Sequence, residues 1–515
     1  MKIVQVLESY VSGRWTAGTG AAQTLLNPAT EEPLATASSE GIDLAAALDH
    51  ARNIGGPALR ALSFSARGAI LQGIADALQD ARDELLALGI ANGGNTRSDA
   101  KFDIDGAIGT LLAYAELGTA LGAGRFLSDG EGLQLGRSPR FHGQHVAVPR
   151  HGVAVHINAF NFPAWGFAEK AAAALLAGMP VLSKPATATA LVAYRAMQVI
   201  ADAKVVPEGA LALLVGGPRD LPALLGAQDV LAFTGSGETG ERIRALPNVI
   251  RHAVRVNVEA DSLNAAVLGP DVEARSDMYE LFLKDVVRDV TQKAGQKCTA
   301  IRRVLVPQQI LAALREDLVE MLGAVRVGDP ADEEVRMGPL ASGAQLADVV
   351  AGMEKLGMES NRISGAPGRL LEKGFFVSPA LFEYESDSKA KAVHDREVFG
   401  PVVSLLPYQE NPAAIVARGN GGLVCSLYSE DTAWLEQAVM GVAPWHGRIF
   451  LGHPKIELSP GPGTVLPQLV HGGPGRAGGG EELGGRRALS IYMQRVALEG
   501  SRPVIAALTK GSSAA

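Results

Sequence analysis

The spacing of hydrophobic and polar residues changes from one segment of the chain to the next, and these changes indicate where its structural units begin and end. Between residues 43 and 121, after short predicted strands and turns, apolar residues recur every three or four positions. That spacing predicts helices, with Asp or Ser near their starts and glycine near their ends. From about Arg125 to Arg150 the pattern becomes short, polar and broken by glycines. We expect a hairpin there that extends from the body.

Short apolar strands alternate with helical segments from His151 to about Ala260. This alternation predicts a parallel sheet with helices on both faces, and hence an α/β fold in which ligands bind where strands end and helices begin. A second α/β unit is predicted from about Ala266 to Tyr408. One more strand is expected within residues 489–500, and a frayed tail at residues 511–515.

A chain of 515 residues is too long for one ordinary core, so we expect two or more domains. The net charge of −8 disfavours a nucleic-acid partner, although a local basic patch could still hold an anionic substrate. The two cysteines, Cys298 and Cys425, are too few for a disulfide framework and indicate reduced thiols. Neither a signal peptide nor an apolar stretch long enough for a bilayer is evident. We therefore expect a cytoplasmic protein without a membrane partner.

The segment LAFTGSGETG carries the dinucleotide pattern G-x-G-x-x-G at Gly235, Gly237 and Gly240. A second match, GPGRAG, starts at Gly473, and a chain with 60 glycines is expected to hold about one match by chance. The first match follows a predicted strand and opens a helix, which is the context of a nucleotide-binding turn. Glu259, at the end of the next strand, is then either a ligand of the cofactor ribose or a cap on an exposed strand end.

Two further segments carry residues suited to covalent chemistry. Cys298, in AGQKCTA, has polar neighbours and precedes a strand, which favours a reactive thiol over a buried one. Cys425 stands in an apolar strand and is expected in the core. Asn158 and Asn161, in HINAFNFPAWG, follow a strand end, where an amide could donate to a developing oxyanion or stabilise a turn.

Six segments together resemble the aldehyde dehydrogenase superfamily, in that family's order and spacing and over nearly the whole chain. They are N-F-P at 161–163, S-K-P-A at 183–186, F-T-G-S at 233–236, Glu259, G-Q-K-C at 295–298 and E-V-F-G-P at 397–401. In this family the phosphate turn is F-T-G-S-x-x-x-G, so Gly237 is incidental and GPGRAG is a coincidence.

The resemblance implies the family's fold, an α/β aldehyde dehydrogenase fold of three parts. These are a Rossmann-like cofactor domain at 1–124 and 151–265, an α/β catalytic domain at 266–470, and a small β oligomerisation arm at 125–150 and 486–510. An edge strand of the arm would pair with a neighbour's sheet, so a homodimer is the smallest expected assembly.

The resemblance also implies a role for each residue of the six segments. Cys298 as a thiolate attacks the aldehyde carbon, and the Asn161 amide and the Cys298 backbone N–H stabilise the oxyanion. Hydride passes to the nicotinamide, and Glu259 activates water to hydrolyse the thioester, so Glu259 is a general base rather than a ribose ligand. No metal is implied, and the implied cofactor-binding residues are Ile157, Asn158, Lys184, Ala186, Thr187, Gly217, Phe233, Gly235, Ser236, Gly240, Glu397 and Phe399.

The chain departs from the family pattern at several positions. Thr187 stands where many NAD-using members have a glutamate, and threonine beside Lys184 would tolerate a 2′-phosphate, which favours NADP. The residues after Glu259 read EADSLN, so the surroundings of the base differ from the usual ones. Glu482 stands where a second, proton-relaying carboxylate is found, although a structural role is equally open. His471 could touch substrate or be solvated.

These departures resemble the branch of the family that oxidises CoA-linked semialdehydes in benzoate and other aromatic catabolism. Arg125, Arg137, Arg140 and Arg150 are candidates for positive charge near the substrate entrance, or equally a solvated face. The alternatives are an acylating, CoA-dependent enzyme, a general dehydrogenase of free aldehydes, or a non-catalytic binding protein on the same fold. Glu259 argues against the acylating enzyme, and Cys298, Asn161 and Glu259 together argue against the binding protein.

Overall fold

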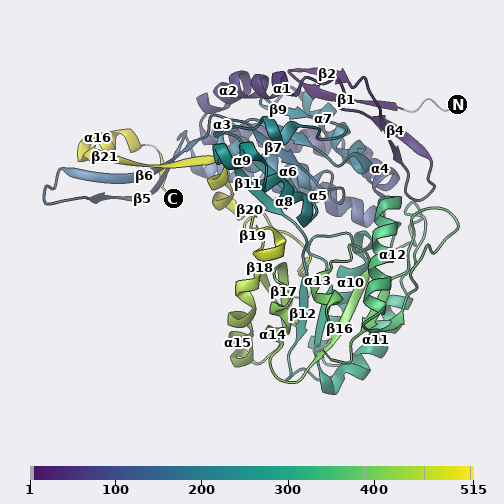
Figure 1. Ribbon diagram of the computed structural model, residues 1–515. Helices are drawn as coiled ribbons and strands as arrows, with labels where there is room; N and C mark the ends of the chain where they lie inside the picture. Colours follow the sequence, from purple (N-terminus) through teal and green to yellow (C-terminus); the bar gives the residue numbers. More distant parts are fainter. Residues whose placement is uncertain (1–4, 387–389, 457–458, 511, 515) are drawn as a thin grey trace.

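The structure is a computed structural model that describes residues 5–386, 390–456, 459–510 and 512–514. Two lobes, each built around its own sheet, lie one beside the other, and a long arm leaves the N-terminal lobe (Figure 1). Helices and largely parallel strands alternate in both lobes, which confirms the predicted α/β class.

The N-terminal lobe contains a nine-stranded sheet in the order β11-β10-β7-β8-β9-β1-β4-β3, with β2 paired to β1. Its central strands β10, β7 and β8 are parallel neighbours and almost fully buried, as expected when helices cover both faces of a sheet. The strands are β1 Gln5–Val11, β2 Arg14–Ala17, β3 Gln23–Leu26, β4 Pro33–Ala37, β7 Ala154–Ile157, β8 Val181–Lys184, β9 Leu211–Leu213, β10 Val230–Thr234 and β11 Arg255–Glu259.

The helices of this lobe cover its sheet and form the largest core cluster with it. In the central helix α6, alanines let neighbouring elements approach closely, and every residue except Gly166 and Glu169 is buried. The helices are α1 Leu44–His50, α2 Gly56–Ala61, α3 Phe64–Asp80, α4 Arg82–Gly93, α5 Arg97–Leu121, α6 Trp165–Ala177, α7 Ala190–Ala203, α8 Gly237–Arg244 and α9 Pro247–His252.

The C-terminal lobe contains a seven-stranded sheet in the order β14-β15-β16-β13-β12-β17-β18, parallel except for β14. Its strands are β12 Ala265–Leu268, β13 Arg303–Pro307, β14 Asn361–Ser364, β15 Ala380–Glu383, β16 Val402–Tyr408, β17 Gly422–Tyr428 and β18 His446–Gly452. Its helices are α10 Asp277–Thr291, α11 Leu311–Gly323, α12 Gly343–Gly357, α13 Ala392–Asp395, α14 Pro412–Ala417 and α15 Thr432–Val442.

The arm contains the predicted hairpin and the predicted C-terminal strand. Strand β6 (Phe141–Pro149) pairs antiparallel with both β5 (Leu127–Gln134) and β21 (Met493–Ser501). Helix α16 (Arg502–Thr509), which was not predicted, and the short β22 (Ser513–Ala514) follow. The frayed tail was predicted for residues 511–515, of which 511 and 515 lie outside the described residues. Ser513 and Ala514 pair with β5, so the prediction is wrong for these two residues.

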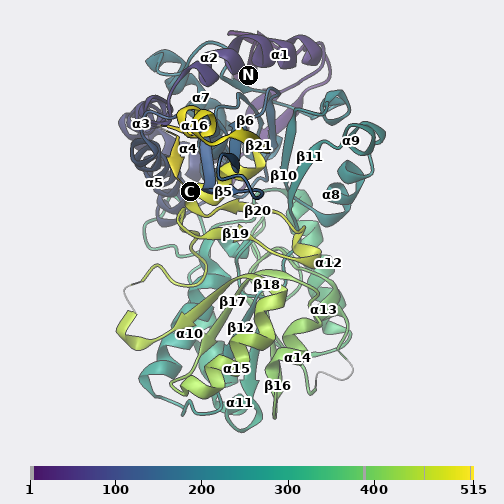
Figure 2. The same cartoon turned by 90° about the vertical axis from the view of Figure 1, so that its left-hand side faces the viewer.

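A short hairpin of β19 (Val470–Gly472) and β20 (Glu481–Leu483) crosses between the two lobes (Figure 2). Its glycine-rich connection packs against the end of β11, because a Cβ at Gly478 would lie 2.2 Å from the carbonyl oxygen of Val258. The GPGRAG match is therefore part of a close packing contact. Among the described residues, no helix is both long enough and apolar enough to cross a membrane.

Candidate active site

A sharp turn after α10 presents Cys298. Three consecutive residues, Lys293, Ala294 and Gly295, have φ angles of 55°, 52° and 68°, a conformation that costs energy for any residue with a side chain. Gly295 is required here, because a Cβ would lie 2.2 Å from the carbonyl oxygen of Gly400. Strain of this kind persists only where the surroundings hold it.

Side chains from the C-terminal lobe hold this turn in place. Asn264 Nδ2 donates to the carbonyl oxygens of Cys298, at 2.8 Å, and of Ala300, at 2.9 Å. Arg302 donates to the carbonyl oxygens of Gly295 and Gly400, each at 2.9 Å. The backbone on both sides of the thiol is thus fixed, while the thiol itself stays partly exposed.

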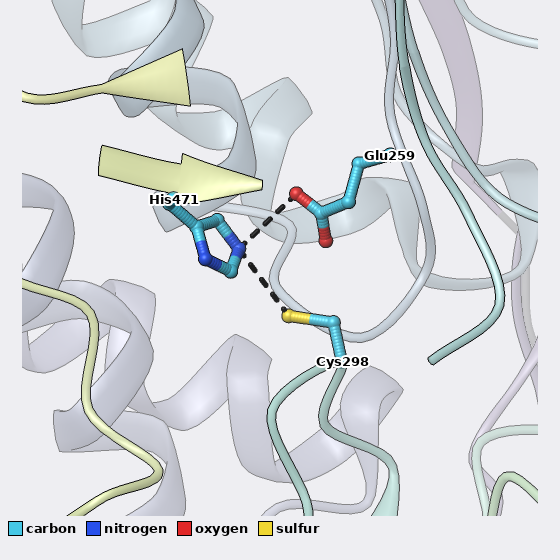
Figure 3. Close-up of side chains that lie close together, drawn as sticks. All are labelled: Glu259, Cys298 and His471. Carbon is cyan, nitrogen blue, oxygen red and sulfur yellow. Dashed lines mark hydrogen bonds and ion pairs between the residues drawn. The ribbon is translucent and has the colours of Figure 1, made fainter. Parts of the chain in front are cut away.

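Three reactive groups from distant parts of the sequence meet at this turn (Figure 3). Glu259 ends strand β11 and His471 lies in β19, and both are almost fully buried. His471 Nε2 is 3.1 Å from Glu259 Oε2 and 3.6 Å from Cys298 Sγ. The sequence predicted Cys298 and Glu259 as a pair, whereas the contact of His471 with both was not predicted.

Burial and charge shift the protonation of all three groups. Burial raises the pKa of the Cys298 thiol well above its usual range, and the nearby Glu259 and Glu169 carboxylates add to this. Burial alone would also raise the pKa of Glu259, but the adjacent His471, with Lys170, lowers it to about 2. Burial by itself would lower the pKa of His471, but the Glu259 carboxylate has the larger effect, so the pKa of His471 is raised. These shifts favour a protonated thiol beside an imidazolium–carboxylate pair.

A second charged cluster lies behind Glu259. Lys170 Nζ is 2.9 Å from Glu482 Oε2 and 3.0 Å from Glu169 Oε1, and Asn257 Nδ2 donates to Glu482 Oε1 at 3.0 Å. Burial raises the pKa of Glu482 to about 7, although Lys170 opposes the shift. Carboxylate oxygens of Glu169, Glu259 and Glu482 all lie within 4.8 Å of one another. A proton could pass between these groups at neutral pH.

Two cavities meet at the thiol. Cys298, Glu259, Asn161, Ala159 and Thr234 line both of them. The smaller cavity, about 40 Å³, is lined in part by aromatic and aliphatic side chains, and the larger, about 700 Å³, opens along the carboxyl ends of β10 and β11. A nucleophile between two cavities can face one reactant from each side.

The family of the chain follows from comparison with known proteins. The model of the aldehyde dehydrogenase family matches residues 15–494. The chain belongs to the aldehyde dehydrogenase family. It is 45% identical over 477 residues to the 3,4-dehydroadipyl-CoA semialdehyde dehydrogenase of Aromatoleum evansii, a match that covers 91% of this chain and 93% of that protein.

Solved structures confirm the fold of this dehydrogenase. The NAD⁺ complex of an aldehyde dehydrogenase from Bacillus cereus has a TM-score of 0.84 at 24% identity and covers 97% of each chain. The apo form of a betaine aldehyde dehydrogenase variant from Staphylococcus aureus has a TM-score of 0.84 at 22% identity, with 97% of this chain and 96% of that chain covered. The predicted membership, the predicted fold and the predicted likeness to the CoA-semialdehyde branch are thus confirmed.

The larger cavity of the dehydrogenase contains several of the residues predicted for the nicotinamide cofactor. Ala186, Gly235, Ser236, Glu397 and Phe399 line it. Ser236 caps α8 through its side chain, and Gly240 lets this helix approach β11, because a Cβ there would lie 2.8 Å from Val258 Cγ1. The buried Phe233 packs under this turn. Strand, turn and helix thus have the shape that a dinucleotide requires.

The remaining predicted cofactor residues lie at the ends of β7 and β8 and in the loop after β9. Ile157 is buried, Asn158 Nδ2 donates to Ser183 Oγ at 3.1 Å, and Gly217 accepts from Ser39 Oγ at 2.8 Å. Thr187 Oγ1 donates to the carbonyl oxygen of Gly216 at 3.1 Å. Their contacts are with the protein, so whether they touch cofactor stays a prediction.

Lys184 is a buried cation without a neutralising carboxylate. Burial lowers its pKa to about 8, and no ion pair of Lys184 occurs within the part of the chain that the structure describes. An unpaired ammonium at a strand end that leads to the cofactor cavity suits an anionic ligand group. The residues present therefore fit a nicotinamide dinucleotide.

Protein groups already satisfy Glu397. Its carboxylate accepts from the Ser262 backbone N–H at 2.9 Å and from Arg302 Nε at 3.2 Å. Burial raises the pKa of Glu397 to about 7 despite the Arg302 charge. Phe399 packs edge-on against Phe160, with ring centroids 5.7 Å apart. Both residues also line the larger cavity.

Two further contacts in this site were not predicted. Lys170 and Glu169 form an ion pair inside an otherwise apolar helix, a charged pair that could have been noticed in GFAEKAAAALLA. Asp261 Oδ1 accepts from the Gly237 backbone N–H at 3.1 Å, so a carboxylate already interacts with the start of α8. No sequence signal distinguishes this aspartate from a solvated one.

The arginines predicted near the substrate entrance lie elsewhere. Arg137 and Arg140 lie in the connection between the arm strands β5 and β6, and Arg125 lies two residues before β5. Arg150 is buried and donates to the carbonyl oxygens of Ala227 and Gln228. None of the four lines either cavity at Cys298. The prediction of a substrate contact is wrong for Arg150, because its guanidinium joins the arm to the N-terminal lobe.

Proposed function

We propose that this dehydrogenase oxidises a CoA-linked semialdehyde, 3,4-dehydroadipyl-CoA semialdehyde or a close analogue, to the carboxylic acid in benzoate catabolism. The observation that carries the proposal is the 45% identity, over 91% of the chain, to a protein named for that substrate. Shared ancestry over nearly the full length supports a shared reaction.

In the proposed reaction Cys298 is the nucleophile and the Asn161 amide, with the Cys298 backbone N–H, stabilises the oxyanion. The bound nicotinamide cofactor supplies the hydride acceptor. Glu259 then takes a proton from water, which attacks the thioester, and the acid leaves the sulfur as a free thiol. Glu482, with a pKa of about 7 and its oxygens within 4.8 Å of those of Glu259, is suited to carry the proton onward. Retention of this base favours hydrolysis over transfer of the acyl group to CoA.

A groove beside the smaller cavity is consistent with a long substrate. The smaller cavity shares Phe102, Trp165 and Val465 with a groove of about 570 Å³ that runs between α5 and residues 460–468. Gly106 and Gly109 form part of its floor, and Lys101 stands exposed beside it. The absence of a side chain at the two glycines leaves room for an extended pantetheine-like chain, and the ammonium of Lys101 suits a phosphate.

The substrate assignment is tested by initial rates of cofactor reduction with the CoA-linked semialdehyde and with short free aldehydes, each with NADP and with NAD. We expect kcat/KM for the CoA-linked substrate to exceed that for free aldehydes by about 100-fold or more, because binding of the remote CoA part contributes to the rate. Equal or better turnover of the free aldehydes would contradict the assignment and leave a general aldehyde dehydrogenase.

We also propose NADP as the cofactor. Thr187 carries no charge that would repel a 2′-phosphate, and the unpaired Lys184 would attract one. Thr187→Glu is expected to shift the ratio of kcat/KM for NADP and NAD toward NAD by about 10-fold or more, because the new carboxylate repels the phosphate. Thr187→Gln is the matched control, because glutamine has the shape of glutamate without its charge, and it should change the ratio much less. An unchanged ratio in Thr187→Glu would show that this position does not contact the ribose.

We further propose that the enzyme is a homodimer formed through the arm. Apolar side chains are exposed along it, among them Leu133, Leu135, Phe141, Val496, Val504 and Leu508. A second copy of the chain could cover them with its own sheet edge.

A further inference from the structure

One nitrogen atom of His471 is shared between the nucleophile and the base. Nε2 is 3.1 Å from Glu259 Oε2 and 3.6 Å from Cys298 Sγ, and both contacts point to the same edge of the imidazole (Figure 3). The roles assigned above to Cys298, Asn161 and Glu259 make no use of it. A hydrogen on this nitrogen can be donated to either group, to the one that carries the negative charge.

The fold holds this imidazole firmly beside Glu259. β19 pairs with β20, which sets His471 opposite Glu482. The connection between them bonds to the strand end that carries Glu259, through Ala260 N–H to the Ala477 carbonyl at 3.0 Å and Gly480 N–H to the Val258 carbonyl at 3.1 Å. His471 is only 4% exposed. Its position is therefore set by the same backbone that positions the base.

The surroundings of the sulfur oppose a thiolate. The carboxylates of Glu259, Glu169 and Glu397 all disfavour a negative charge on Cys298. Two other cations in this region already have partners, since Lys170 is held by Glu169 and Glu482, and Arg448 donates to the Pro462 carbonyl. His471 is the cation in hydrogen-bond range of the sulfur among the described residues. A thiolate formed here needs that positive charge.

We propose that His471 is a further catalytic residue, whose imidazolium stabilises the Cys298 thiolate during attack and pairs with Glu259 at other stages. The inference rests on the covalent chemistry of the proposed function, but not on its substrate. The S–H bond of Cys298 breaks and its proton passes to water in the larger cavity, while His471 keeps its own proton and donates it in a hydrogen bond to Sγ. Once the sulfur is acylated it carries no negative charge, so the imidazolium then pairs with the Glu259 carboxylate, which is free to take a proton from the attacking water.

The proposal has a consequence for pH. Since Glu259 raises the pKa of His471, the imidazolium persists to higher pH than that of an isolated histidine and is lost as pH rises through that raised value. Removal of His471 is expected to move the formation of the thiolate to higher pH, because the carboxylates then act on the sulfur without a counter-charge.

The test measures alkylation of Cys298 by iodoacetamide in the enzyme without substrate, from about pH 6 to about pH 10, followed at the Cys298 peptide by mass spectrometry. In His471→Asn and His471→Gln we expect alkylation near neutral pH to fall about 10-fold or more, with the pH midpoint moved upward. His446→Gln, which removes another buried histidine, is the matched control and should leave the profile unchanged.

The two outcomes are distinct. An alkylation profile that is the same in the wild type and in both folded His471 variants, with folding checked by thermal unfolding and cofactor binding, would overturn the proposal even if turnover were lost. That result would leave His471 a structural or substrate contact. Because no aldehyde is present, a wrong substrate assignment cannot produce either outcome.

Discussion

Cys298→Ala is expected to abolish aldehyde oxidation, with turnover falling on the order of 10⁴-fold or more. Cys298 is the thiol at which the two cavities meet, and no other sulfur within the described residues reaches them. Without it no covalent intermediate forms, and the remaining groups can only bind the reactants. Initial rates of cofactor reduction under saturating substrate measure the loss.

The second cysteine provides the matched control for this experiment. Cys425 lies in β17 within the core of the C-terminal lobe, where burial raises the pKa of its thiol to about 12. Cys425→Ala removes a thiol that faces no cavity, so we expect nearly full turnover with a modest loss of stability. Cys298→Ala should bind cofactor as the wild type does, and appreciable turnover in this variant would rule out the covalent route.

Local patterns were sufficient to predict much of the fold. The alternation of strands and helices from His151 predicted the parallel sheet, and the glycine-broken stretch before it predicted the hairpin of the arm. The turn at Gly235 and the helix start at Ser236 were visible as well, because phosphate turns depend on short-range glycine spacing. Strand order lies outside such patterns, and so does the pairing of β21 with β6, which joins segments more than 300 residues apart.

The reactive site was predictable only in part, for a related reason. Cys298, Glu259 and Asn161 belong to short motifs and could be named from them. His471 stands 173 residues after Cys298, in a segment that reads as a polar loop, and becomes a partner of the thiol only when β19 crosses between the lobes. Lys170 was hidden in an alanine-rich helix, where the burial that makes its charge important does not show in the sequence.

Glu259→Gln is expected to separate the two halves of the reaction. The variant keeps Cys298 and loses the base, so one equivalent of reduced cofactor should form rapidly, and steady-state turnover should then fall about 10²- to 10⁴-fold. Rapid-mixing measurement of cofactor reduction would show the burst and the slow phase.

The acyl group that remains on Cys298 in this variant can be observed directly. Intact mass spectrometry should show the enzyme with one added acyl group, which hydroxylamine would release because thioesters react with that nucleophile. Glu259→Asp, which restores a carboxylate one methylene farther from the sulfur, is the control and should recover part of the steady-state rate without a lasting adduct. Multiple rapid turnovers in Glu259→Gln would show that another group activates the water, and Glu482, with a pKa of about 7, would be the first to replace.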